Sequence, residues 1–168
     1  MAFNQLIVVI LILLIIWYLS FSASRLDRLH HRVETSLATL DSLLQKRAAI
    51  ATEIIRESNL DPASAYLISS SARTARDAMI ADRSEAESVL SESLKMIQEI
   101  SYDESLELPS DLLVELSDVT AKIKVAINLH LEAVNAAKNV RRKLIIRLFR
   151  LAGKAPEPVR YAFEDDVL

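Results

Sequence analysis

Hydrophobic side chains fill the first part of the chain without interruption. Every position from Leu6 to Leu19 is hydrophobic, and no charged side chain precedes Arg25. This stretch reaches the ~20 residues that a helix needs to cross the hydrocarbon core of a bilayer. Because lipid offers the backbone no hydrogen-bond partners, a segment in that environment must be helical. We therefore expect residues 1–24 to form a transmembrane anchor.

The residues that flank this segment predict its orientation. Trp17 and Tyr18 lie near its end, where amphipathic rings favour the level of the lipid headgroups, and we expect them to be interface anchors. Arg25, Arg28 and Arg32 follow directly, whereas no basic side chain comes before the apolar run. Positive charge is retained on the cytoplasmic side of a membrane. We expect a single-pass protein of the inner membrane whose N-terminus lies outside and whose remaining chain is cytoplasmic.

A cleaved signal peptide is the alternative interpretation of the same segment. The small residues Ser22, Ala23 and Ser24 resemble a cleavage site. Against this interpretation, the segment lacks the basic start of a signal peptide, and its apolar run is long for one. The pattern favours an anchor and leaves cleavage open.

After the anchor, apolar residues recur at alternating spacings of three and four, which is the pattern of helices packed along their length. The first series is Leu26, His30, Val33, Leu37, Leu40, Leu44, Ala48, Ala51 and Ile55. The second, weaker series is Ile68, Ala72, Ala75, Met79, Ala86, Leu90, Leu94 and Ile97. The third is Leu112, Leu116, Val119, Ile123, Ala126, His130, Ala133, Ala137, Val140, Leu144, Leu148 and Leu151.

Breaks between the series set the expected helix ends. Asp61 is placed to cap a helix that has Pro62 at its first position, and Ser110 or Asp111 can cap the next one. Gly153 then ends the last helix. We expect one helix from the membrane to about residue 57, a second over 62–101 and a third over 110–152. Short connections favour an all-α, antiparallel three-helix bundle over 25–153, followed by an extended tail over 154–168.

Composition excludes most kinds of enzyme. The 168 residues include one glycine and no cysteine, and the net charge is −3. Glycine-rich phosphate loops and nucleophile elbows cannot be built from one glycine. The nearest approach to a di-iron motif is Asp27 with His30, and it has no second copy. We expect no catalytic residues, no metal, no cofactor and no small-molecule substrate.

The last predicted helix ends in a basic, amphipathic segment. We expect it and the tail to carry partner-docking or membrane-docking residues, namely Arg141, Arg142, Lys143, Arg147, Phe149, Arg150, Tyr161 and Phe163. Such a segment can form the end of a bundle, a dock for an acidic protein or a helix on the membrane surface. Nucleic acid is disfavoured, because stacking aromatic residues are lacking and the overall charge is negative.

The soluble part of the chain resembles the LemA family, and specifically a divergent single-pass member of actinobacterial type. The likeness rests on the order of segments 25–34, 40–47, 72–76, 86–94, 129–135 and 161–164. The chain differs from the family pattern at two places. The family has an aromatic residue where this chain has His130, and the family has a Phe-Pro step where this chain has Arg-Leu-Ala-Gly-Lys at 150–154. The resemblance implies an outside N-terminus and a cytoplasmic helical bundle, and it brings no catalytic residues.

These observations favour a non-enzymatic interaction protein. We expect an accessory, assembly or scaffold subunit of an inner-membrane complex, with a respiratory or cell-envelope assembly as a natural host. Its expected partners are membrane lipid, through the anchor, and one or more membrane proteins. The alternative is a membrane-anchored signalling or sensor adaptor, which is weakened because only about five residues would lie outside.

Overall fold

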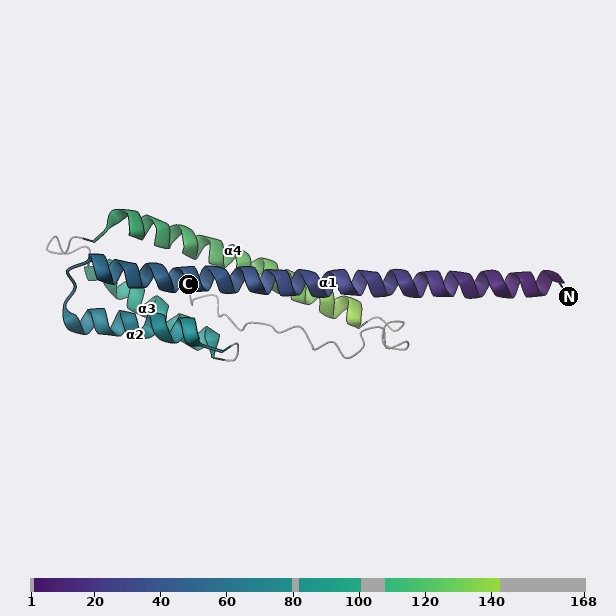
Figure 1. The fold of residues 1–168 in the computed structure, drawn as a ribbon, viewed down its shortest axis with the longest axis horizontal. Coiled ribbons are helices and arrows are strands. Elements are labelled where there is room, and N and C mark those ends of the chain that lie inside the picture. The colour runs from purple at the N-terminus through teal and green to yellow at the C-terminus, as the bar shows by residue number, and fades with distance from the viewer. Residues whose placement is uncertain (1, 80–81, 101–107, 143–168) are drawn as a thin grey trace. The chain divides into compact units, whose positions relative to one another are not determined.

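A computed structural model describes residues 2–79, 82–100 and 108–142 of the chain. All regular structure in these residues is helical, which confirms the all-α fold (Figure 1). The helices are α1 (Ala2–Glu57), α2 (Pro62–Asp77), α3 (Arg83–Ile100) and α4 (Ser110–Arg141). The predicted end of the first helix and the predicted start of the last one are both confirmed.

The chain divides into two compact units, and α1 and α4 contribute to both. The first, called here the two-helix unit, comprises residues 2–36 and 131–142 of the described chain. The second, called the four-helix unit, comprises the described residues of 37–130. The predicted anchor boundary at residue 24 falls inside α1, which continues as one helix beyond it.

In the two-helix unit, residues 26–33 of α1 pack against the end of α4. Leu26 is buried with Val140, and Val33 is buried with Ala133. Early positions of α1 therefore meet late positions of α4, so the two helices are antiparallel. Ala133 and Ala137 are fully buried, and their small side chains let the helix backbones approach closely. The contact confirms both predicted apolar series in this part of the chain.

The four-helix unit has one hydrophobic core to which all four helices contribute. Most of its buried residues are members of the predicted series: Leu40, Leu44, Ala48, Ala51, Ile68, Ala72, Ala75, Ala86, Leu90, Leu94, Ile97, Leu116, Val119, Ile123 and Ala126. Ile50 and Ile54 are buried as well, whereas Ile55, the predicted last member of the first series, is only partly buried. His130, the polar member of the third series, is also buried. Burial of apolar surface at these positions is the main force that holds the helices together.

The start of α2 is fixed by the predicted cap. The Asp61 carboxylate accepts hydrogen bonds from the backbone N–H groups of Ala63, at 2.9 Å, and of Ser64, at 3.1 Å. These bonds satisfy donors that have no partner inside a helix. Pro62 occupies the first turn, where its missing N–H is not needed.

The prediction of one helix over 62–101 is wrong, because α2 ends at Asp77 and α3 begins at Arg83. The two helices fold back on each other, so the described residues contain four helices and the three-helix detail is not confirmed. Met79, which we placed in the apolar series, is one of the most exposed hydrophobic residues, at 79%. Asp82 and Glu85 have the spacing of a helix start, a signal that the weak periodicity of this region concealed.

Arg83 explains why the chain can turn at this point. Its guanidinium donates to the carbonyl of Ala75, at 3.3 Å, in the last turn of α2. It also donates to the Asp41 carboxylate of α1, at 2.7 Å. The Arg83 cation thus stabilises a carbonyl at the C-terminus of α2, where positive charge is favourable. It also joins the α2–α3 hairpin to α1.

Candidate functional site

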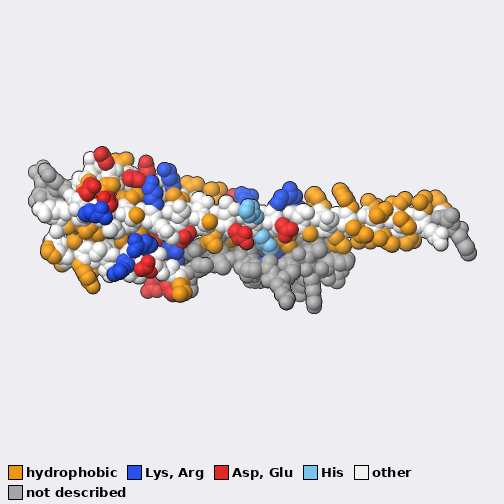
Figure 2. Space-filling view, viewed as in Figure 1, with side chains coloured by type: hydrophobic (Ala, Val, Ile, Leu, Met, Phe, Trp, Pro, Cys, Tyr) orange, Lys and Arg blue, Asp and Glu red, His pale blue; other side chains and the backbone are white. Residues whose placement is uncertain are grey.

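Residues 6–19 of α1 form an uninterrupted apolar surface. Its most apolar stretch has a mean hydropathy of 2.8, and none of that stretch is buried. Figure 2 shows hydrophobic side chains covering this end of α1. Within the described residues, α1 is the only helix long and apolar enough to span a membrane, by length and composition. Trp17 and Tyr18, the predicted interface anchors, are exposed, and Trp17 stacks on Phe21 with ring centroids 6.2 Å apart.

The three arginines that follow this surface differ in their contacts. Arg25 and Arg28 are exposed. The Arg32 guanidinium lies 3.5 Å from the Glu132 carboxylate of α4, in an exposed ion pair within the two-helix unit. Exposed pairs of this kind contribute at most about 1 kcal/mol, so the pair with Glu132 holds Arg32 only weakly.

Most of the predicted C-terminal docking residues fall beyond the described part of the chain. Arg141 is the last residue of α4, and the backbone N–H of Arg142 donates to the Lys138 carbonyl at 3.1 Å. Lys143, Arg147, Phe149, Arg150, Tyr161 and Phe163 lie outside the described residues, as do the predicted stop at Gly153 and the tail over 154–168. Docking by this segment stays a prediction.

The α2–α3 hairpin carries a surface groove of about 720 Å³ that sequence reasoning missed. Four of the residues lining it are exposed apolar side chains: Tyr66, Leu67, Met79 and Val89. Its charged lining comprises Arg73, Asp77, Asp82 and Glu85, so acidic residues outnumber basic ones. The groove exists because the chain turns back after Asp77. A sequence read as one continuous helix cannot reveal it.

A buried ion pair crosses the interior of the four-helix unit. The Arg47 guanidinium of α1 lies 3.2 Å from the Glu87 carboxylate of α3, and both side chains are almost completely buried. Arg47 Nη2 also donates to the Glu87 carbonyl, at 3.0 Å, and to the Ser91 hydroxyl, at 2.7 Å. The Ser91 hydroxyl in turn donates to the Glu87 carbonyl at 2.9 Å. This network connects α1 to α3 through polar contacts inside an apolar core.

The two ion pairs between α1 and α3 occur in the same order along both helices. Asp41 pairs with Arg83, and Arg47, further along α1, pairs with Glu87, further along α3. The two helices therefore run in parallel, as first and third helices do in an up-down-up-down bundle. The polar pairs fix which residues of α1 and α3 face each other, a specificity that apolar contacts alone enforce less strongly.

Burial governs the electrostatics of the pair. Desolvation raises the pKa of Glu87, and the attraction of Arg47 and then Arg83 only partly opposes that rise. Desolvation likewise lowers the pKa of Arg47, against the attraction of Glu87. Among the described residues, neither carboxylate oxygen of Glu87 accepts a hydrogen bond. Burial at this position therefore disfavours the charged form of both side chains.

The pair of Arg47 and Glu87 was not predicted, although the sequence contains a signal for it. Arg47 comes three residues after Leu44 and four before Ala51, so it shares the core-facing stripe of α1. Glu87 stands three residues before Leu90 on α3. Charged residues at apolar positions of two different helices indicate a buried pair.

The described residues contain no group of three or more His, Asp or Glu side chains placed to hold a metal ion. Comparison of the chain with protein-family models, with curated proteins and with solved structures finds no match.

Proposed function

We propose that this chain is a non-enzymatic, membrane-anchored helical protein that serves as an accessory, assembly or scaffold subunit of an inner-membrane complex. The observation that carries the proposal is the exposed apolar surface of α1, continuous with a helix that is buried in a packed core. An exposed apolar segment that enters the membrane, followed in the chain by a folded helical unit, would make a tethered docking module. The LemA-like resemblance supports the same topology.

The groove of the α2–α3 hairpin supplies the surface that such a subunit needs. A groove between two helices accepts a third, amphipathic helix, whose apolar side chains would contact Tyr66, Leu67 and Val89. The acidic residues on its lining favour a partner helix with Lys or Arg beside its apolar face. We therefore assign the groove to a basic, amphipathic helix of a membrane-protein partner.

The partner proposal is tested by changing the groove without changing the fold. Leu67 and Val89 are exposed, so Leu67→Asp and Val89→Asp leave the core intact. Val125 is equally exposed on α4 and outside the groove lining, which makes Val125→Asp the matched control. After gentle solubilisation, native electrophoresis should show the wild type and the control in a large complex and the groove variants released from it. Migration of the wild type alone at every detergent concentration contradicts the proposal.

Membrane topology is tested separately by cysteine labelling, which suits a chain without cysteine. In intact cells an impermeant maleimide should label the Asn4→Cys variant, and should label the Glu57→Cys variant only after lysis. Labelling of Glu57→Cys in intact cells contradicts a cytoplasmic bundle. A mature chain that begins near Ser24 contradicts the anchor and favours the signal-peptide alternative.

A further inference from the structure

A second cavity lies inside the four-helix unit, away from the hairpin groove. It has a volume of about 310 Å³ and is lined by residues of α1, α3 and α4. This volume is at the lower end of the range for small-molecule sites, so the cavity fits a compact ligand and not a protein segment. Its chemistry is independent of the docking surface proposed above.

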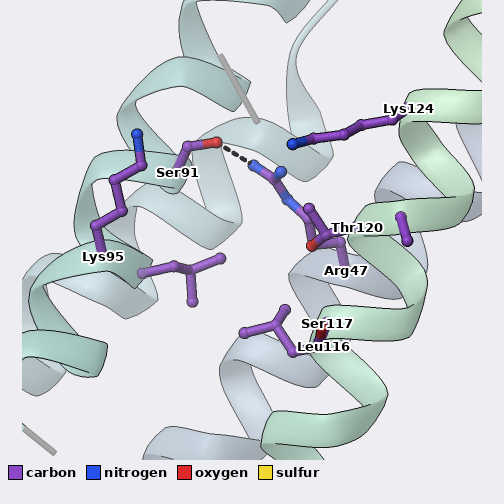
Figure 3. A pocket seen from close by; sticks show the side chains of 9 residues that line it. Arg47, Ser91, Lys95, Leu116, Ser117, Thr120 and Lys124 are labelled. Carbon is purple, nitrogen blue, oxygen red and sulfur yellow. Dashed lines mark hydrogen bonds between the residues drawn. The ribbon is translucent and has the colours of Figure 1, made fainter. Parts of the chain in front are cut away.

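The charged residues that line this cavity all have the same sign. Arg47 comes from α1, Lys95 from α3 and Lys124 from α4, and no acidic residue is among the described residues of the lining. Figure 3 shows the Arg47 guanidinium, the Lys124 ammonium and the Ser91 hydroxyl around one part of the cavity, with the Ser91–Arg47 hydrogen bond dashed. Like charges gathered at one cavity repel each other unless an anion lies between them.

Arg47 brings an unfilled donor to this place. The residue is 1% exposed, and its Nη2 makes the contacts to Glu87 and Ser91 already described. Its Nε is buried and has no hydrogen-bond partner among the described residues. A buried donor without an acceptor costs free energy, and an oxyanion oxygen beside it removes that cost. Arg47 therefore adds to the wall of the cavity a buried cation whose donors are not all used, and a guanidinium is well suited to attract a phosphate.

Glu87 does not cancel the positive character of the cavity. Its carboxylate contacts Arg47 but is not part of the lining. Even if the negative charge of Glu87 fully offsets the positive charge of Arg47, the positive charges of Lys95 and Lys124 remain. The exposed stems of both lysines allow their ammonium groups to move onto a bound anion. The net field at the cavity therefore favours a ligand with more than one negative charge.

Hydroxyl and apolar groups complete the lining. Ser117 and Thr120 of α4 contribute hydroxyl groups in addition to that of Ser91. Leu94 and Leu116 form an apolar part of the cavity wall. Hydroxyl groups and cations together are typical of sites for phosphate oxygens, and the apolar wall suits a short organic group attached to the phosphate. We propose that this cavity binds the phosphate of a small phosphomonoester, held by Lys95, Lys124 and the buried Arg47.

The phosphomonoester could be a soluble molecule or the headgroup of a lipid such as phosphatidic acid. The experiment uses the full chain in phosphatidylcholine nanodiscs and titrates glycerol 3-phosphate at constant ionic strength, with binding followed by calorimetry. A second series adds phosphatidic acid to the nanodiscs. Competition between the two phosphates assigns the site to the lipid headgroup, and unaltered binding of glycerol 3-phosphate assigns it to a soluble ligand.

The variants Lys124→Gln and Lys95→Gln test the assignment of residues, because both side chains are exposed and their loss should leave the fold intact. Lys122→Gln is the matched control, since Lys122 is exposed on the same helix but does not line the cavity. Loss of one charge-assisted contact should weaken binding about tenfold, and the control should bind like the wild type. Absence of saturable binding of both phosphates to the wild type, or equal binding by all variants, overturns the proposal.

Discussion

The Arg47 guanidinium of α1 lies 3.2 Å from the Glu87 carboxylate of α3, with both side chains buried. The preceding residue, Lys46, makes an ion pair with Glu115 of α4 at 2.8 Å, and both of those side chains are substantially exposed. Adjacent residues of one helix thus form the same kind of contact in two different environments. This pairing offers an internal comparison of buried and exposed charge.

Arg47→Met should destabilise the four-helix unit by about 3 kcal/mol, because it leaves the Glu87 carboxylate buried without its cation. Lys46→Met should cost less than about 1 kcal/mol, since water screens the exposed pair. Denaturant unfolding of the full chain in detergent measures both changes. Similar losses in the two variants would show that burial does not decide the strength of these pairs.

Replacement of both buried partners should recover most of that loss. The double variant Arg47→Met with Glu87→Leu removes both desolvated charges and fills the space with apolar groups. We expect its free energy of unfolding to match or exceed that of the wild type, and therefore the two single changes to be non-additive. A double variant less stable than Arg47→Met alone contradicts this account.

The stability of the chain should depend on pH through Glu87. Burial raises the pKa of its carboxyl above the ordinary value of 4.5, so the folded state holds this proton more tightly than the unfolded state. The stabilisation is complete below the unfolded pKa and is lost as pH rises through the folded pKa. Glu87→Gln has no carboxyl to titrate, so its stability relative to wild type should increase as pH rises from the unfolded pKa through the higher, folded pKa of Glu87. A constant or falling difference over that interval argues against a raised pKa.

The cap of α2 has the opposite pH dependence. The hydrogen bonds from Ser64 and then Ala63 lower the pKa of Asp61 below its ordinary value of 3.8. Its contribution is present above the unfolded pKa and is lost as pH falls through the lower, folded pKa. Asp61→Ala should lower the thermal midpoint by a few degrees at neutral pH, whereas Asp61→Asn should retain the cap and lose the acid dependence. Equal midpoints for Asp61→Ala and wild type contradict a structural role for the cap.

Close packing in the two-helix unit should make Ala133 intolerant of a larger side chain. Ala133 is fully buried against α1, whereas Asn135 of the same helix is exposed. Ala133→Leu should cost about 1–3 kcal/mol by overpacking, and Asn135→Leu should have little effect. Hydrogen exchange should show faster opening of the last turns of α4 in the first variant only. Unchanged protection there would mean that the helices do not pack at this position.

A charge within the apolar surface of α1 should weaken membrane integration. Ile12 lies in the middle of this surface and is exposed, and Ile12→Arg should cost about 2.5–3.5 kcal/mol at the bilayer centre. Ser24→Arg places the same charge beyond the apolar stretch and should be tolerated. Alkaline extraction of membranes separates integrated from released protein. Equal retention of both variants would count against α1 as a spanning helix.

Periodicity along the chain was enough to predict the core of each long helix. Leu40, Leu44 and Ile123 are buried as the spacing of apolar residues requires, because the backbone of a helix puts every third or fourth side chain on one face. The start of α2 was also predictable, since Asp61 and Pro62 act on the helix that immediately follows them. These features depend on neighbours in sequence, and the sequence determines them directly.

The turn between α2 and α3, the hairpin groove and the cationic cavity were decided by the tertiary structure. Arg83 can end α2 only because folding brings Asp41 and the Ala75 carbonyl to the same guanidinium. Likewise, Arg47, Lys95 and Lys124 line one cavity although they lie on three helices. A sequence states which side chains are charged. The free energy of packing decides which of them leave water and which are brought together, because it sums contacts between residues far apart in the chain.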